Sequence, residues 1–136
     1  MTDDLKATLD PKRKSWIESA NDAQCDFPIQ NLPFGVFSSA SNAKARVGVA
    51  IGDSVADLAV LHDAGLLRLP ASAPQDVFAR AALNDFIDLG RDVWRSVRVQ
   101  LSSLLARDTA TLRDDSALRQ RAFTKLADAK LHLPVE

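Results

Sequence analysis

The stretch RVGVAIGDSVADL at residues 46–58 decides which fold this chain can adopt. Val47, Val49 and Ile51 alternate with glycine and alanine, and a period of two places the branched side chains on one face of a β-strand. Gly52 and Asp53 then fit a two-residue turn, because glycine in the first position favours a primed turn whose twist matches the flanking strands. We therefore predict a β-hairpin in which Ile51 faces Ser54, Val49 faces Ala56 and Val47 faces Leu58.

The apolar segment FPIQNLPFGVF at residues 27–37 precedes the hairpin and can supply further strands. The hairpin needs them, because one of its faces is too small to exclude water and an isolated hairpin is marginal in water. Pro28 and Pro33 lack backbone donors, so neither fits the middle of a central strand. We expect an extended edge segment over residues 27–32, a short strand over 35–39 and a polar loop over 38–45, with residues 15–17 as a candidate first strand.

Helical periodicity replaces this alternation after Asp57. Asp57 is a favourable N-cap for a short helix that Gly65 ends. A loop is expected over residues 66–74, and a helical turn is expected within residues 75–82. The strands therefore come early in the chain, and helices follow them.

The strongest helical pattern spans residues 83–108. Asn84 is the candidate N-cap, and we expect Gly90 to divide the segment into two helices, because glycine inside a helix costs about 1 kcal/mol relative to alanine. A further helix is expected over residues 115–123, with Asp114 as its N-cap. A strand-rich first half followed by helices indicates the α+β class.

The composition is that of a soluble globular protein. The chain has 136 residues, of which 46% are hydrophobic and 26% charged, so one domain with its own core is expected. The net charge of -1 gives no general attraction to nucleic acid or to an anionic membrane. No segment approaches the ~20 apolar residues of a membrane span, and the polar start MTDDLKATLDPKRK is not a secretory signal. The single cysteine fits a reducing cytoplasm.

The histidines and the cysteine of this sequence form no pattern typical of a site. His62 and His132 are far apart, and Cys25 has no histidine at ligand spacing. Cys25 also lies beside an aspartate, which disfavours the reactive thiolate. His132 stands between two leucines, in a segment that is either a strand or an extended linker. We expect all three residues to be structural.

The glycines and aspartates likewise have structural explanations. Gly48 and Gly52 do not open a helix, so they do not form a phosphate-binding loop. Asp53 is a turn residue, and Asp114 and Asp115 are explained by capping and by the helix dipole. We therefore assign no catalytic, cofactor-binding or metal-binding residue.

Arginines are concentrated in the helical part of the chain. Seven arginines and four aspartates between residues 91 and 121 leave a local charge of +3. A solvated face, or a face that meets an acidic partner domain, explains this charge better than nucleic-acid binding, because no aromatic residues are interleaved for base stacking. The arginines are Arg91, Arg95, Arg98, Arg107, Arg113, Arg119 and Arg121.

Five strings of sequence, in order, resemble the N-terminal domain of the fumarylacetoacetase family. The resemblance that they carry extends over nearly all of the chain after residue 14. The strings are DFPIQNLPFGVFS (26–38), RVGVAIGDSVADL (46–58), LNDFIDLGRDVW (83–94), LRDDSALRQRAF (112–123) and LHLP (131–134).

The resemblance implies a small, partly open β-barrel of the SH3 type with appended helices. It implies a polar tail over residues 1–14, the domain over 15–123, and a linker over 124–136 that leads to a catalytic domain absent from this chain. In the family that catalytic domain brings a Ca or Mg ion and a histidine–glutamate pair that activates water to cleave a carbon–carbon bond. Neither the family's first metal ligand nor its base falls within this chain, and His132 is not that base.

Two functions of different classes follow. The first is a non-catalytic N-terminal domain of fumarylacetoacetase, in the cytoplasm, whose partner is the catalytic domain of the same enzyme and, through it, a homo-oligomer. Neither nucleic acid nor a membrane is expected as a partner. The alternative is a free-standing module that binds a peptide or protein through a groove near Phe34 and Phe37. Leu131 and Leu133 are candidates for an exposed apolar patch.

Overall fold

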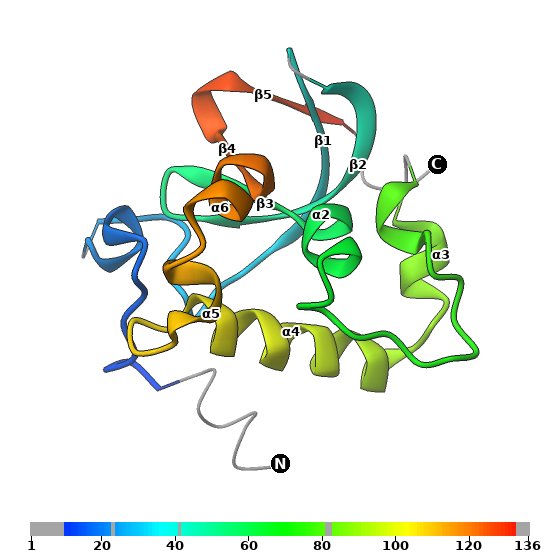
Figure 1. The fold of residues 1–136 in the computed structure, drawn as a ribbon, viewed down its shortest axis with the longest axis horizontal. Helices are drawn as coiled ribbons and strands as arrows, with labels where there is room; N and C mark the ends of the chain where they lie inside the picture. The colour runs from blue at the N-terminus through cyan, green and yellow to red at the C-terminus, as the bar shows by residue number, and fades with distance from the viewer. Residues whose placement is uncertain (1–9, 23, 41, 81–82, 133–136) are drawn as a thin grey trace.

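The structure, a computed structural model, describes residues 10–22, 24–40, 42–80 and 83–132. In that part of the chain five strands form one sheet, against which helices and 3₁₀ turns pack (Figure 1). The strands are β1 (Phe34–Ser39), β2 (Asn42–Ile51), β3 (Ser54–Asp57), β4 (Phe123–Lys125) and β5 (Ala129–His132). The helices are α2 (Leu58–Asp63), α3 (Asn84–Ile87), α4 (Arg91–Leu105), α5 (Ala110–Arg113) and α6 (Ser116–Ala122), and the 3₁₀ turns are η1 (Glu18–Asn21), η2 (Val77–Ala79) and η3 (Leu126–Asp128).

The sheet is antiparallel throughout and has the order β4-β3-β2-β1-β5. The predicted hairpin is confirmed, since Ile51 pairs with Ser54 and Val49 with Ala56. The described ladder ends at Gly48 opposite Asp57, so the expected pair of Val47 with Leu58 was wrong: Leu58 already begins α2.

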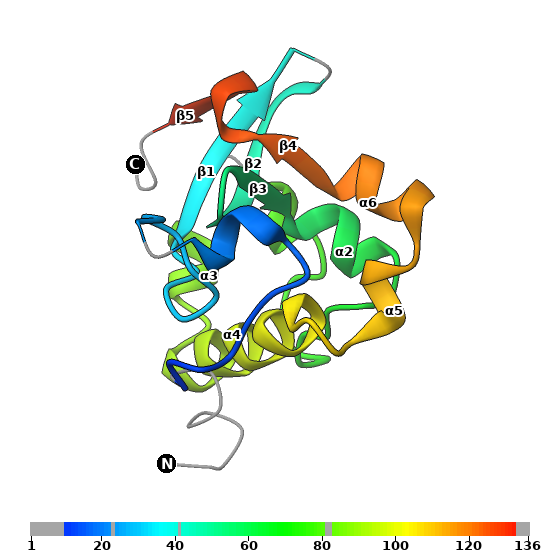
Figure 2. The same cartoon turned by 90° about the vertical axis from the view of Figure 1, so that its left-hand side faces the viewer.

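One face of the sheet carries the main core. Val47, Val49 and Ile51 are fully buried on this face, as the alternation predicted. Opposite them, α4 presents its own buried stripe of Val97 and Leu101, with α2, α5 and α6 between the helix and the sheet (Figure 1). Both views place α4 at the far end of the molecule from β5 (Figure 2).

The other face of the sheet lies inside a curled half-barrel. Phe37 (1% exposed) and Val55 (4% exposed) cover the glycine-rich centre of this face. A Cβ built on Gly48 would lie 2.6 Å from the Phe37 ring and 2.7 Å from Cγ1 of Val55, so only glycine fits there. The β4–η3–β5 segment bends across the open side, where the Leu126 amide donates to the Asp53 carbonyl oxygen at 2.8 Å. The α+β small-barrel prediction is therefore confirmed.

The expected linker over residues 124–136 is corrected by the structure as far as residue 132. Residues 124 and 125 belong to β4, and β5 pairs with β1 from Val36 opposite His132 to Ser39 opposite Ala129. These short strands are held by pairing with distant strands, which a local pattern does not reveal. The remaining residues, 133–136, lie outside the described part of the chain.

Three further strand predictions were wrong in detail. The segment 27–32 is not extended: the Asn31 amide bonds to the Pro28 carbonyl at 2.9 Å, and Leu32 has a φ of +42°. The expected loop over 38–45 is mostly strand, because β1 reaches Ser39 and β2 begins at Asn42. Residues 15–17 contribute only one isolated bridge, between Ser15 and Ala106.

Two predicted helix boundaries, at Asp57 and at Gly90, are confirmed, whereas two predicted N-caps are wrong. The Asp57 side chain accepts from the amides of Ala59 and Val60, as expected of an N-cap, and Gly90, with a φ of +95°, separates α3 from α4. Asn84 and Asp114 were wrong as N-caps by one residue each. The N-cap positions are held by Leu83, without a side-chain bond, and by Asp115, which accepts from the Leu118 amide at 3.1 Å.

Candidate functional site

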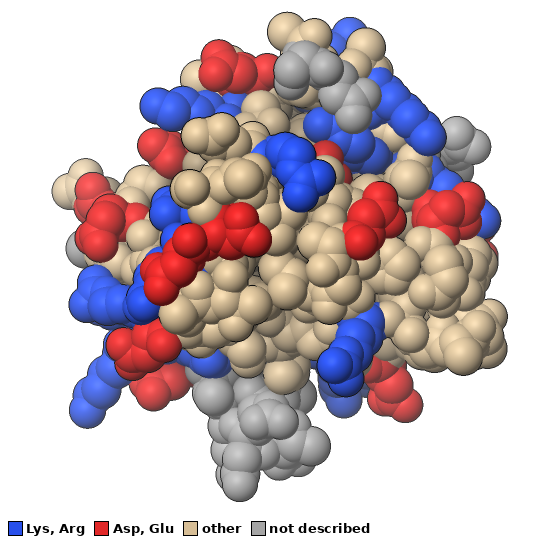
Figure 3. All heavy atoms as spheres, viewed as in Figure 1, with Lys and Arg blue, Asp and Glu red and all other residues tan. Residues whose placement is uncertain are grey.

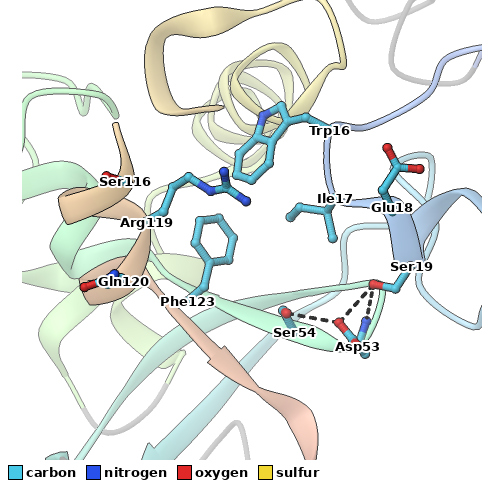
Figure 4. A pocket seen from close by; sticks show the side chains of 10 residues that line it. All are labelled: Trp16, Ile17, Glu18, Ser19, Asp53, Ser54, Ser116, Arg119, Gln120 and Phe123. Atoms are coloured by element: carbon cyan, nitrogen blue, oxygen red, sulfur yellow. Dashed lines mark hydrogen bonds between the residues drawn. The ribbon is translucent and has the colours of Figure 1, made fainter. Parts of the chain in front are cut away.

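A pocket of about 570 Å³ lies where the N-terminal segment crosses the hairpin turn and α6 (Figure 4). We call it the Trp16 pocket. Three separate stretches of sequence meet there, which is why no single motif predicted it. Its lining residues are Trp16, Ile17, Glu18, Ser19, Asp53, Ser54, Ser116, Arg119, Gln120 and Phe123.

One wall of the Trp16 pocket is aromatic and cationic. The Trp16 ring meets the Phe123 ring edge-on, with centroids 5.6 Å apart, and the Arg119 guanidinium lies 4.5 Å from the centre of the Trp16 ring. The indole nitrogen of Trp16 donates to the Leu104 carbonyl at 2.8 Å, and Arg119 Nη1 donates to the Arg113 carbonyl at 3.0 Å. These contacts fix the wall and join the N-terminal segment to α4 and α6.

The polar side of the Trp16 pocket is centred on Asp53 (Figure 4). Its carboxylate accepts hydrogen bonds from the hydroxyls of Ser19 at 2.9 Å and Ser54 at 3.2 Å. The bond from Ser19 is the largest cause that lowers the pKa of Asp53 below its ordinary value. Asp53 is therefore ionised at neutral pH and is suited to accepting hydrogen bonds rather than to donating a proton.

A second hollow, which we call the apolar groove, opens into the half-barrel and has a volume of about 210 Å³. Leu131 on its rim is 67% exposed, whereas Phe37 on its floor is 1% exposed. The groove therefore exists near Phe34, as the sequence suggested, but Phe37 is a floor residue and not a free contact. All ten lining residues are apolar: Phe27, Pro33, Phe34, Gly35, Phe37, Gly48, Ala50, Val55, Leu126 and Leu131.

A buried ion pair lies inside the half-barrel, and the sequence reading missed it. Arg46 Nε donates to Asp57 Oδ2 at 2.6 Å, and the two side chains are only 7% and 6% exposed. The Arg46 guanidinium also lies 4.3 Å from the centre of the Phe37 ring. The hairpin register contained the signal, because Gly48 faces Asp57 and Arg46 is the next residue on the same face of β2.

The two histidines and the cysteine lie in separate places. His132 Nε2 is 2.8 Å from the Ser38 hydroxyl, and His62 Nε2 is 3.2 Å from the Gln75 amide oxygen. The Cys25 sulfur accepts from the Phe27 amide at 3.3 Å. Across the described ranges, no three histidine, cysteine, aspartate or glutamate side chains lie together as a metal site requires.

The arginines of the helical region are divided among different contacts. Arg98 donates to the Asn31 carbonyl at 2.6 Å and lies 5.7 Å from the centre of the Phe34 ring, and burial lowers its pKa. Arg113 pairs with Asp114 at 2.9 Å, and Arg119 packs on Trp16. Figure 3 shows basic and acidic side chains interspersed over the face it displays, without one continuous basic patch. In the described part of the chain no helix is both long and apolar enough to cross a membrane.

Comparison with known proteins gives one family. The family described as "Fumarylacetoacetase N-terminal" matches residues 30–134. The chain is 52% identical over 121 residues to the fumarylacetoacetase of Mus musculus and 46% identical over 121 residues to that of Homo sapiens. Each match covers 88% of this chain and 28% of the relative. A match to the Caenorhabditis elegans fumarylacetoacetase, at 45% identity, covers 82% of this chain and 26% of that relative. The chain thus spans little more than a quarter of these relatives.

Proposed function

Because this chain belongs to the family of fumarylacetoacetase N-terminal domains, we propose that it is the non-catalytic N-terminal domain of a fumarylacetoacetase. The whole enzyme would be a metal-dependent hydrolase that cleaves 4-fumarylacetoacetate to fumarate and acetoacetate in the breakdown of tyrosine and phenylalanine. The observation that carries the proposal is the family match over residues 30–134, together with 52% identity to the mouse relative.

The contribution of this domain in the proposal is structural. Two of its polar clusters are the Trp16 pocket, whose carboxylate accepts hydrogen bonds from two serines, and the buried pair of Arg46 and Asp57. Both stabilise local structure rather than present a nucleophile or a base to a substrate. In the proposal, the Ca or Mg ion of the whole enzyme is held by the remaining part of the protein.

The proposed partner is the catalytic part of the same enzyme, and through it a homo-oligomer. A cytoplasmic location is part of the proposal. It is supported by the single cysteine of the chain, which fits a reducing compartment.

A hydrolysis assay tests the proposal. The loss of fumarylacetoacetate is followed with added magnesium or calcium for this chain alone, and for a fusion of this chain to the remaining part of mouse fumarylacetoacetase. We expect hydrolysis by the fusion and none by the chain alone. Hydrolysis by the chain alone would overturn the non-catalytic role. A folded fusion without activity would overturn the assignment to this enzyme.

The apolar groove favours a second candidate, a free-standing module that binds a peptide or protein. Phe34 and Leu131 are available there as contacts, whereas the buried Phe37 is not. An inactive fusion, together with saturable binding of a hydrophobic peptide that Leu131→Ser abolishes, would favour this candidate.

A further inference from the structure

We propose that the apolar groove is where this domain docks the part of the fumarylacetoacetase chain that follows it, with Leu131 as the central contact. The inference rests on the proposed function, because it takes its partner from there. It adds a location, which neither the family match nor the relatives' names provide.

The lining of the apolar groove indicates an apolar occupant. None of its ten residues is charged or polar, so an ionic ligand would find no partner there. Leu131 is 67% exposed, and Ile87 is the one other large hydrophobic residue of the described chain that is classed as exposed. A leucine so exposed beside a hollow of apolar residues is typical of an interaction surface.

The position of Leu131 in the sheet adds a second argument. Leu131 lies on β5, one of the two edge strands of the described sheet, opposite Phe37 of β1. An edge strand that carries an exposed leucine is prone to aggregate unless something covers it. A permanent occupant of the groove would remove that risk.

The geometry of the chain favours a tethered occupant. The matched family is N-terminal, and the relatives are several times longer than the matched region, so in them further residues follow the counterpart of β5. β5 itself forms a rim of the groove. A segment attached there has a high effective concentration at the groove and needs little buried area to stay bound.

The small size of the groove disfavours a second copy of this chain as its occupant. A stable dimer of independent chains buries roughly 1,600 Å² in total. The groove has a volume of only about 210 Å³, with one strongly exposed leucine. An untethered copy would therefore bind weakly at this place.

Thiol labelling tests the proposal. In a Cys25→Ser background, Leu131→Cys is introduced into this chain and into its fusion with the remaining part of mouse fumarylacetoacetase. Peptide mass spectrometry then follows the modification of residue 131 by a maleimide. Ser103→Cys, at an exposed position of α4, is the matched control. We expect labelling of residue 131 to be about tenfold slower in the fusion, while residue 103 reacts equally in both proteins.

Three results separate this proposal from the proposed function. Equal labelling of residue 131 in both proteins, in a fusion that hydrolyses fumarylacetoacetate, overturns the docking site and leaves the function standing. Protection of residue 131 in a fusion without activity supports docking and counts against the assigned activity. Protection in the isolated chain that grows with its concentration points to a second copy and overturns the proposal.

A misfolded fusion is recognised by Val97→Cys, because Val97 is fully buried in the folded domain and reacts only when the core is open. In that case the two parts are mixed as separate polypeptides and the labelling of residue 131 is compared with and without the second part. Protection again supports docking, and no protection at saturating concentrations of the second part overturns it.

Discussion

The ring of Phe37 lies against the backbone of Gly48, so closely that a Cβ on Gly48 would be 2.6 Å from its Cε1 atom. The two residues are on neighbouring strands, since Phe37 pairs with Arg46 and Gly48 is the next residue on that face of β2. The inner face of the half-barrel is filled in this way by one large ring over a residue without a side chain. The face of the hairpin that carries only small residues therefore accommodates the ring of Phe37.

Gly48→Ala should destabilise the domain. The new methyl group would overlap the Phe37 ring and Val55, and neither can move freely inside the half-barrel. Overpacking of this kind costs typically about 2 kcal/mol in the free energy of unfolding. Urea unfolding measures the change. Gly35→Ala is the control, because a Cβ there meets nothing within 4 Å, and it should change stability by less than about 1 kcal/mol. Equal effects at both positions would contradict the steric explanation.

Gly52→Ala should also destabilise, for two reasons that a control can separate. Gly52 has a φ of +57°, which costs a non-glycine residue about 1–2 kcal/mol. A Cβ there would also overlap the Ser19 hydroxyl oxygen and lie 2.8 Å from the Ala20 amide nitrogen. Gly65→Ala, at a φ of +82° with open space around the Cβ, carries the strain alone. Thermal unfolding should show a larger loss for Gly52→Ala, and a smaller or equal loss would exclude the contact with η1.

The hairpin and the α4 stripe could be predicted because their signals are local. The alternation around Val49 and the helical spacing of Val97 and Leu101 need no knowledge of the partner elements, and both were confirmed. For β5 the sequence left both a strand and an extended linker open around His132, because the strand has four residues and is defined by its pairing with β1. The alternation of Leu131 and His132 fits a linker as well as a strand, and only the pairing with β1 distinguishes the two.

The two hollows of the surface were harder to predict than the fold. The Trp16 pocket joins residues near position 16, the turn at Asp53, and Arg119 and Phe123 on α6 and β4. Only the tertiary structure brings these segments together. The apolar groove was predicted in part. The sequence indicated apolar residues near Phe34, but it did not reveal that Phe37 is buried by packing against Gly48.

The stability of the domain should fall in acid partly through Asp53. Hydrogen bonds, first of all from Ser19, lower the pKa of Asp53 in the folded state. A carboxylate with a lowered folded pKa contributes stability above its unfolded pKa and loses it as the pH falls through the folded pKa. Ser19→Ala should raise the pKa of Asp53 toward its ordinary value. The variant should therefore lose less stability than the original chain between about pH 5 and about pH 3.

NMR titration of the Asp53 carboxyl group and urea unfolding at both pH values measure this effect. Ser54→Ala is the matched control, because Ser54 donates to the same oxygen over the longer distance of 3.2 Å and lowers the pKa of Asp53 less. We expect a smaller rise in the pKa of Asp53 for Ser54→Ala than for Ser19→Ala. An unchanged titration in Ser19→Ala would show that the Ser19 hydroxyl does not hold the carboxylate in solution.

The buried pair of Arg46 and Asp57 should be strongly coupled. Removing one partner of a buried ion pair leaves the other charge without compensation and typically costs about 3–5 kcal/mol. We expect Arg46→Met and Asp57→Asn each to lower the free energy of unfolding by about 3 kcal/mol. The double variant should lose much less than the sum, because no uncompensated charge remains in the half-barrel. The exposed pair of Arg113 and Asp114 provides the comparison.

A double-mutant cycle measures this coupling by urea unfolding. Arg113→Met and Asp114→Asn should each have little effect and should add independently, because water screens an exposed pair. Asp57 also accepts from the Ala59 and Val60 amides at the start of α2, and Asn retains an acceptor for those bonds. The measured coupling therefore reports on the charge pair rather than on the helix cap. Independent addition of Arg46→Met and Asp57→Asn would mean that the pair contributes no coupling and that packing of Arg46 on Phe37 explains its burial.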